Sequence, residues 1–329
     1  MKLIPKLRLV MKQKRYAEST QKSYVYWVKK YVHFHQLKHP DLMGAEEVTT
    51  FLNHLVTDEN VAASTQNQAL CALVFFYRYV LGREPGEFEG LKRASRPRKL
   101  PVVLSADEVK GLFEHMPPAL VLHAQLLYGS GMRLSELLNL RIKDVDFDQH
   151  ALTIREGKHG KDRIAIFPDA LRTSMRLQID STKQLHRREV RCGRGYVTLP
   201  AALAKKYPNR AQEEKWQFVF PASRASVNEK GQMGYHHLHP TTLQRAVSRA
   251  AKAAGIDKSV GCHTLRHCFA THLLEQGIDI RTIQTLLAEE GCPPGPATAV
   301  QGSEIQIQIF SQPAHSRAPD FSLKCLSAL

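Results

Sequence analysis

The sequence changes character at about Ala288, which limits the part of the chain that can build packed domains. Up to Leu287 it carries helical and strand-like apolar patterns, whereas residues 288–329 hold five of its 17 prolines, beginning with Pro293, Pro294 and Pro296. Closely spaced prolines stop a helix because they lack the backbone N–H. The stretch EIQIQIF at 304–310 alternates like a strand but has no evident partner. We therefore expect an aberrant and mostly disordered tail over residues 288–329.

The surplus of positive charge lies before this point. The chain has a formal net charge of +15, and its tail holds two basic and four acidic residues. Residues 1–287 therefore carry 44 basic and 27 acidic residues, a net charge of +17. A surplus of this size favours a polyanionic partner, with nucleic acid ahead of a membrane surface. A charge that serves only solubility is the alternative.

Neither the cysteines nor the apolar segments indicate export. The six cysteines form no CxxC pair and have no regular spacing. This pattern is typical of buried or incidental thiols in a reducing compartment. The first residues are interrupted by Pro5, Lys6 and Arg8 before they reach the length of a signal peptide. No apolar run approaches the roughly 18 residues of a membrane span. We therefore expect a cytoplasmic protein without a membrane partner.

Residues 1–84 predict a small all-helical domain. Apolar side chains three and four apart mark three helices, the first with Ser19 or Thr20 as N-cap, the second over 48–55 and the third over 65–81 with Gly82 as C-cap. The first helix carries an aromatic stripe that includes Trp27 and Tyr31. We assign this stripe to the core first and to a DNA contact second.

A basic linker is expected at residues 85–100. Its second half holds five basic residues and no acid: Lys92, Arg93, Arg96, Arg98 and Lys99. A solvated tether is the simple interpretation. A basic segment between two basic domains also suits a clamp around a duplex, because each cation near a phosphate releases counterions.

Residues 101–287 predict a second domain of the α+β class, mainly α, with a small antiparallel sheet. Ser105 and Glu108 form a capping box that opens its first helix. A hairpin is expected at 151–167, a strand at 216–220, and helices at 120–128, 169–188, 240–255, 263–276 and 279–287.

Four residues of this second domain suit the chemistry of a phosphate. Arg133 follows the turn Gly129-Ser130-Gly131, His263 and Arg266 lie three apart on one helical face, and Lys158 lies in the hairpin tip. Arginines neutralise non-bridging oxygens in a bidentate manner, a lysine can protonate a leaving oxygen, and a histidine can move a proton. Each piece alone is more often structural, but together, in this order in a basic two-domain chain, they are a strong indication of chemistry on a phosphate.

A metal-dependent hydrolase is the alternative outside DNA chemistry. His263 and His267 lie four apart, as two zinc ligands on a helix would. The pair lacks the glutamate of an HExxH motif and a clear third ligand, so no metal is expected.

At the segments GSGMRLSEL, GKHGKDR and CHTLRHCFATHLL the chain resembles the tyrosine recombinase (phage integrase) family. The resemblance implies that a helical DNA-binding domain and a catalytic domain close around DNA and that four protomers assemble on two sites. It also implies that a tyrosine forms a 3′-phosphotyrosine without metal, ATP or other cofactor. Carried over by position, Arg133, Lys158, His263 and Arg266 are catalytic. Lys161 and the linker cations are candidate DNA contacts.

The segment YVTLPAALAKKYPNRAQEEKWQFVFP at 196–221 resembles the insertion of integron integrases, which we place at 193–239. In that branch the insertion grips bases that protrude from a folded single strand. The resemblance makes Tyr207, Trp216 and His237 candidates for such contacts, by stacking. Packing of the insertion is the alternative, and for Trp216 it is the favoured one.

The resemblance stops where the tail begins. In the family a Gly-His pair and then a nucleophilic tyrosine follow the helix that ends here at Leu287, but this chain has no tyrosine after Tyr235. We therefore expect an enzyme by descent that lacks strand cleavage by itself. A frameshift near codon 287 is one hypothesis, which the other two reading frames of the gene would test. A DNA-binding protein that interferes with an intact integrase is the alternative function.

Overall fold

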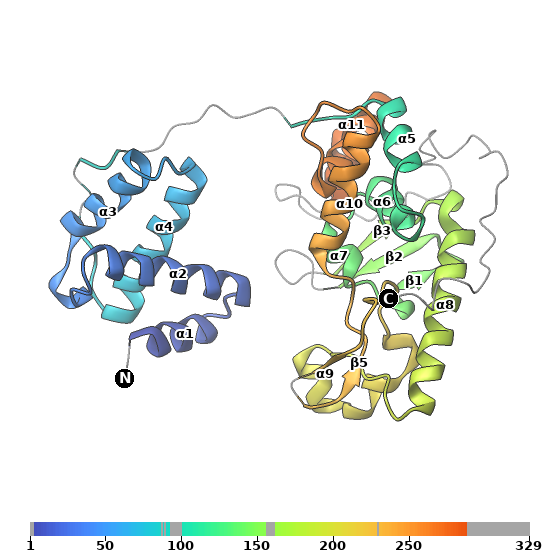
Figure 1. The fold of residues 1–329 in the computed structure, drawn as a ribbon, viewed down its shortest axis with the longest axis horizontal. Helices are drawn as coiled ribbons and strands as arrows, with labels where there is room; N and C mark the ends of the chain where they lie inside the picture. Colours follow the sequence, from blue (N-terminus) through green and yellow to red (C-terminus); the bar gives the residue numbers. More distant parts are fainter. Residues whose placement is uncertain are drawn as a thin grey trace. The chain divides into compact units, whose positions relative to one another are not determined.

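The computed structural model describes residues 3–86, 88, 90–92, 101–155, 162–228 and 230–287. The chain divides into two compact units, Met1–Leu100 and Pro101–Leu329 (Figure 1). The tail over 288–329 and residues 93–100 of the expected linker lie outside the described residues. Helices dominate both units and the second adds small antiparallel sheets, which confirms the predicted fold class. None of the described helices is long and apolar enough to cross a membrane.

The described part of the first unit is built from α1 (Leu3–Gln13), α2 (Glu18–Phe34), α3 (Ala45–Thr57) and α4 (Ala63–Phe76). After α4 the chain forms a π-helical turn, Tyr77–Leu81. This turn ends at Gly82, which has a φ of 76° and is the left-handed C-cap that the sequence predicts. The predicted start of α2 is wrong, because its N-cap is Ala17. The buried Gln21 fixes this earlier start, since its side-chain amide donates to the carbonyl of Tyr16 at 2.8 Å.

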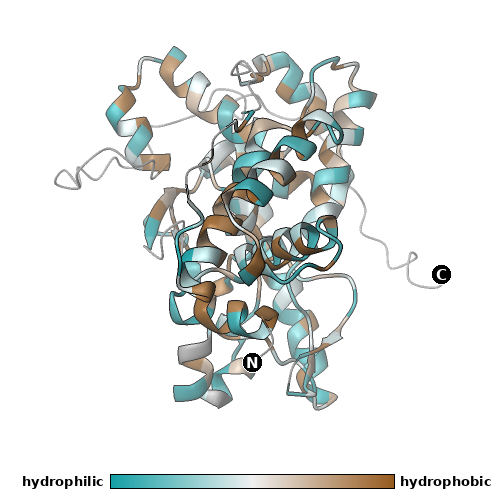
Figure 2. Cartoon of the chain, turned by 90° about the vertical axis from the view of Figure 1, so that its left-hand side faces the viewer, coloured by the Kyte–Doolittle hydropathy of each residue, from teal (hydrophilic) through white to brown (hydrophobic). Residues whose placement is uncertain are grey.

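The aromatic stripe of α2 lies in the core of this unit. Trp27 is 5% exposed and Tyr31 is fully buried. The hydroxyl groups of Tyr31 and Tyr77 are 2.7 Å apart, and the indole N–H of Trp27 donates to Gln68 at 3.1 Å. Trp27 and Tyr31 therefore belong to the core of this unit. Figure 2 shows polar and apolar residues alternating along the helices, as elements with one buried face require.

The second unit opens with α5 (Ala106–Glu114), whose start is the predicted capping box. The backbone N–H of Glu108 donates to Ser105 Oγ at 3.2 Å, and that of Ser105 donates to Glu108 Oε2 at 2.7 Å. The helices α6 (Pro118–Ser130) and α7 (Leu134–Leu138) follow. The helices α10 (Pro240–Ala253), α11 (Cys262–Glu275) and α12 (Ile280–Leu287) come last, and α11 packs along α6.

A three-stranded antiparallel sheet lies between these two groups of helices in the sequence. Its order is β1 (Val145–Asp146), β2 (Ala151–Ile154) and β3 (Arg163–Ile166), with Ile154 opposite Arg163 and Ala151 opposite Ile166. This register confirms the predicted hairpin strands. The long polar helix α8 (Arg172–Arg191) follows a 3-10 turn at Asp169–Leu171.

The segment between α8 and α10 forms a small substructure with its own apolar cluster. It contains α9 (Ala201–Lys206), 3-10 turns at Pro208–Gln212 and Glu214–Trp216, and the short pair β4 (Ser226–Val227) and β5 (Met233–Gly234). Figure 1 shows α9 and β5 at the end of this unit away from α5 and α11. The cluster consists of Val197, Leu199, Ala211, Trp216 and Phe218.

The strand predicted at 216–220 is wrong. A 3-10 turn ends at Trp216, and Phe218 makes only an isolated bridge to Arg141. Directly after Arg141 the backbone enters the 3-10 turn Ile142–Asp144. The pairing with Phe218 therefore does not extend into a β-ladder.

His123 on α6 should make the stability of the second unit depend on pH. Its ring is 5% exposed, lies 4.0 Å from the ring of Phe220 and has no partner for Nδ1 among the described residues. Burial lowers the pKa of His123 to about 4.

Because the unfolded chain binds a proton near pH 6.5 and the folded one does not, stability is complete above that pH and falls below it. We expect a loss of about 2 kcal/mol by pH 5, relative to a His123→Leu variant. Urea unfolding at pH 7.5 and 5 measures it, and equal pH dependence of both proteins would contradict it.

Candidate active site

A sharp turn between α6 and α7 sets the position of Arg133. Gly131 ends α6 with φ 62° and ψ 19°, a left-handed conformation that favours glycine. Ser130 and Met132 on either side of it are almost fully buried. Arg133 is the N-cap residue of α7, and its side chain is 24% exposed. The guanidinium group therefore leaves a firmly packed turn and still reaches the surface.

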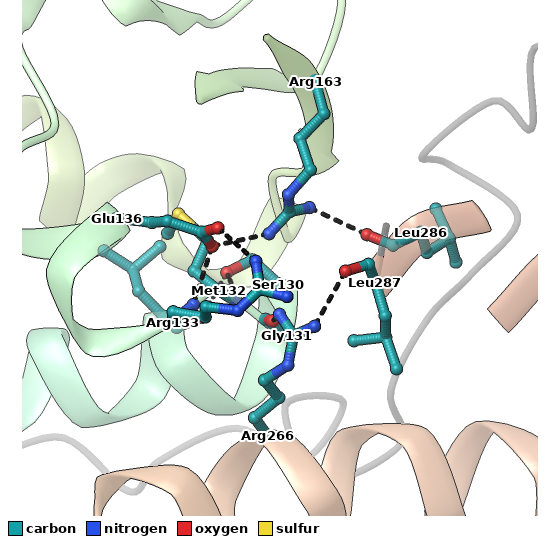
Figure 3. A network of polar contacts seen from close by, with 10 residues as sticks. Ser130, Gly131, Met132, Arg133, Glu136, Arg163, Arg266, Leu286 and Leu287 are labelled. Carbon is teal, nitrogen blue, oxygen red and sulfur yellow. Dashed lines mark hydrogen bonds and ion pairs between the residues drawn. The ribbon is translucent and has the colours of Figure 1, made fainter. Parts of the chain in front are cut away.

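Arg266 on α11 contacts the same turn, although it lies far from it in the sequence. This residue is 3% exposed, and its Nη1 donates to the carbonyl oxygen of Gly131. Its Nη2 donates to the carbonyl oxygen of Leu287, the last residue of α12, at 2.8 Å. The structure thus brings the two arginines of the expected site together, with one acceptor of Arg266 two residues from Arg133 (Figure 3).

His263 lies one turn before Arg266 on α11 and is exposed. Its ring contacts that of His267 at a centroid distance of 4.5 Å and an angle of 76°. Among the described residues these two histidines belong to no group of three or more metal-ligating side chains. The exposed position on the face that carries Arg266 suits a group that exchanges protons with a bound substrate.

Glu136 and Arg163 complete the polar network, and sequence reasoning missed both. Glu136 Oε1 accepts from Arg133 Nη1 at 2.8 Å, and Glu136 Oε2 accepts from Arg163 Nη2 at 2.7 Å (Figure 3). Arg163 at the start of β3 also donates through Nη1 to the carbonyl oxygen of Leu286 at 2.8 Å. The spacing of Arg133 and Glu136 offered a signal, because a glutamate three residues after an N-cap often caps it. Nothing local in the sequence points to Arg163.

The charges in this network hold each other in the ionised form. Burial alone raises the pKa of Glu136, but the hydrogen bond from the backbone N–H of Arg133 and the charge of Arg163 outweigh it and lower that pKa. Burial lowers the pKa of Arg163, and the charge of Glu136 opposes this shift. The carboxylate of Glu136 therefore pairs with two of the three arginines in this region, and Arg266 donates to backbone carbonyls instead. This leaves a positive surplus for an anion.

Several predicted site residues lie outside the described residues. These are Lys158 and Lys161 in the connection between β2 and β3, and Arg93, Arg96, Arg98 and Lys99 in the linker. Lys92 is described: its backbone N–H donates to Asn53 at 2.8 Å and its carbonyl accepts from Gln66 at 2.7 Å. Its backbone is thus tied to α3 and α4, and its side chain is exposed.

The three predicted contacts of the insertion differ in accessibility. Tyr207 is 37% exposed, with the guanidinium of Arg210 4.1 Å from the centre of its ring. Trp216 is 5% exposed, with Lys143 Nζ 3.3 Å from its ring. This burial favours packing over base stacking for Trp216. His237 is half-buried and packs edge-on against Phe218 at 5.3 Å.

Replacing Gly131 by alanine should weaken the unit that carries the site. A Cβ atom there would lie 2.6 Å from Phe269 Cδ1 and 2.9 Å from Leu287 Cδ2, and the backbone has φ +62°. We expect a loss of about 2–4 kcal/mol, from the left-handed backbone and the overpacking together. Urea denaturation measures this loss.

Gly277→Ala is the matched control. Gly277 has φ +85° but nothing within 4 Å of its Cβ position, so only the backbone cost of about 1 kcal/mol applies. Equal losses in the two variants would contradict the tight packing at Gly131.

Comparison with known proteins shows the family of this chain. The model of the phage integrase family matches residues 103–290, and that of the phage integrase N-terminal SAM-like domain matches residues 3–87. An integrase/recombinase from Escherichia coli is 42% identical over 287 residues, 87% of this chain and 85% of that protein. Tyrosine recombinase XerA from Pyrococcus furiosus is 37% identical over 204 residues, 61% of this chain and 58% of that protein. The chain belongs to the phage integrase family.

Solved structures agree with this fold. A lambda integrase dimer bound to a core site has a TM-score of 0.56 at 19% identity, over 88% of this chain and 94% of that one. The XerH recombinase bound to a palindromic difH substrate has a TM-score of 0.52 at 19% identity, over 88% and 75% of the two chains. At these identities the likeness concerns the fold.

Proposed function

We propose that this chain is an integron-integrase-type tyrosine recombinase that binds its recombination sites but does not cleave them by itself. The observation that carries the proposal is the meeting of Arg133 and Arg266 at the Gly131 turn, where Arg266 donates to a residue 135 positions before it in the sequence. Two guanidinium groups beside one turn, in a region with a positive surplus, suit the non-bridging oxygens of a single phosphate.

The residues of this site have separate roles in the proposed chemistry. Arg133 and Arg266 neutralise the phosphate, His263 exchanges a proton with it, and Lys158 protonates the departing 5′ oxygen. In an intact relative a tyrosine oxygen bonds to phosphorus while the bond from phosphorus to the 5′ oxygen breaks. This chain has no tyrosine after Tyr235, so the remaining groups stabilise charge but form no covalent intermediate.

DNA is the proposed partner. The net charge of +17 over residues 1–287 supports it, as do the solved relatives of this fold that are bound to DNA. We propose a helical DNA-binding domain at 1–84, a basic linker at 85–100 and a catalytic domain at 101–287. A lambda integrase of this fold forms a tetramer on a Holliday junction, and a homo-oligomer on DNA is the corresponding proposal here.

The insertion at 193–239 supports the integron type. It is a separate substructure with its own apolar cluster, and it presents Tyr207 beside Arg210. An exposed aromatic ring among cations suits stacking of an unpaired base. Preference for a folded single strand with protruding bases over the matching duplex, reduced by Tyr207→Ala, would support this assignment.

A suicide substrate tests the loss of cleavage. This is a duplex with a nick next to the scissile phosphate, built on a site recovered from a random DNA pool with the full chain. We expect a salt-sensitive complex and no covalent adduct on a denaturing gel. A covalent adduct would overturn the inactive assignment, and failure to enrich any site would overturn site-specific binding.

The second candidate is interference with an intact integrase, and it rests on the same intact DNA-binding features. Adding this chain to a recombination reaction of an active relative distinguishes the two. Loss of recombination supports interference, whereas an unchanged yield supports only the first candidate, an inactive recombinase by descent. A frameshift as the origin of residues 288–329 remains part of this proposal. The family match ends at residue 290, close to the change in composition.

A further inference from the structure

Arg163 joins three elements at the edge of the candidate site. It lies at the start of β3, its Nη2 donates to Glu136 on α7, and its Nη1 donates to the carbonyl of Leu286 on α12. Its side chain is 10% exposed and that of Glu136 is 5% exposed. The Nε atom of Arg163 is buried without a hydrogen-bond partner among the described residues. The guanidinium of Arg163 therefore leaves Nε without an acceptor among the described residues, while Nη1 and Nη2 both donate hydrogen bonds.

Glu136 in turn holds Arg133. Its Oε1 accepts from Arg133 Nη1, and its Oε2 accepts both the backbone N–H of Arg133 and Arg163 Nη2. Within the described structure the guanidinium of Arg133 makes no other hydrogen bond, and its side chain is 24% exposed. The direction of the Arg133 N–H groups depends on Glu136, and the position of Glu136 depends on Arg163.

We propose that Arg163 is a positioning residue for the phosphate-binding guanidinium of Arg133, acting through Glu136 and fixed to the last turn of α12. The proposal rests on the proposed function, because it assumes that Arg133 meets a phosphate. Arg163 itself is 10% exposed, and its two Nη atoms donate to Leu286 and Glu136. A lysine in its place keeps the charge but cannot aim two N–H groups along a rigid fork.

The same contacts also fit a bland interpretation, in which Arg163 only neutralises a buried carboxylate. Removing one partner of a buried pair destabilises a protein strongly, so a simple loss of binding would not separate the two. The quantity that separates the two interpretations is the change in DNA affinity when one phosphate loses its charge. It changes if Arg133 is misaimed and stays the same if only global stability falls.

A methylphosphonate scan measures this response. The full chain is bound to duplexes carrying its selected site, each with one phosphate replaced by an uncharged methylphosphonate. In the parent chain, we expect about a tenfold loss of affinity when the phosphate opposite Arg133 is neutral. Arg133→Ala identifies that phosphate, because this variant no longer distinguishes the two duplexes.

Arg163→Lys should also stop distinguishing them, while it binds the neutral duplex as tightly as the parent does. Glu136→Gln should behave in the same way, and adding Arg163→Lys to it should cause no further change. Arg194→Lys is the matched control, because Arg194 holds the buried carboxylate of Glu189 at 2.7 Å outside this network. This control should distinguish the duplexes as the parent does.

Two results would overturn the proposal in different ways. If Arg163→Lys or Glu136→Gln keeps the tenfold preference of the parent, Arg163 does not position Arg133. If the parent shows no preference at any phosphate, Arg133 meets none and the proposed function fails as well. Should Arg163→Lys melt below the assay temperature, Glu136→Gln carries the test, since it cuts the same link at nearly constant size.

Discussion

Replacing Gly234 by alanine should dismantle the insertion. A Cβ atom at Gly234 would lie 1.7 Å from the carbonyl oxygen of Tyr196, and the atoms nearest to it all belong to the Tyr196 backbone. Moving this backbone aside would break the hydrogen bond that the N–H of Tyr196 donates to the carbonyl of Met233 at 3.2 Å. We expect a loss of about 4 kcal/mol, which exceeds what the small apolar cluster of the insertion can bear.

The two tryptophans make this loss visible. Trp216 is buried in the insertion and Trp27 in the first unit, so in a Trp27→Phe background the fluorescence reports on the insertion alone. We expect a red-shifted emission in Gly234→Ala, together with fast hydrogen exchange over residues 195–239. Protection of α6 and α11 should persist, because their core is a separate cluster.

Gly231→Ala serves as the control in the same hairpin. Gly231 has φ +75° and nothing within 4 Å of its Cβ position, so only about 1 kcal/mol is expected. Native Trp216 emission in Gly234→Ala would show that the close approach to Tyr196 is not required.

The parts of the fold that the sequence predicted are those with local causes. Helical periodicity marked α2, α10, α11 and α12 to within a few residues, and the Ser105 capping box was confirmed atom by atom. Such signals are carried by residues within one or two turns of each other.

What could not be predicted depends on partners far apart in the sequence. The link from Arg163 to Glu136 joins residues 27 apart, and that from Arg163 to Leu286 spans 123. The wrong strand at 216–220 has the same origin, because its apolar letters serve a local cluster and one bridge to Arg141. In the candidate site, residue types foretold two arginines, but only the tertiary fold shows what aims them.

These contacts also bear on the end of α12. Arg163 and Arg266 donate to the carbonyls of Leu286 and Leu287, the last two residues of that helix. Hydrogen bonds from cations to the final carbonyls stabilise a helix end. The end of α12 is therefore held beside the Gly131 turn, and under the proposed function this is where a nucleophile would have to arrive.

A chimera should restore strand cleavage. It joins residues 1–287 of this chain to the C-terminal segment of the Escherichia coli integrase/recombinase, which is 42% identical over 287 residues. Under the proposed function the chain lacks only its nucleophile, so supplying one should be sufficient if the site in residues 1–287 is intact. We expect the chimera to form a covalent adduct on the suicide substrate, whereas the 329-residue chain forms none.

Two variants of the chimera show that the cleavage uses this site. Exchanging the nucleophilic tyrosine that we expect in the transplanted segment for phenylalanine should abolish the adduct, because no oxygen remains to attack phosphorus. Arg266→Ala should slow adduct formation about a hundredfold or more, since one donor to the transition-state charge is lost. A chimera that folds and binds DNA, yet forms no adduct, would place a second defect within residues 1–287, with the network of Arg163, Glu136 and Arg133 as the first place to look for it.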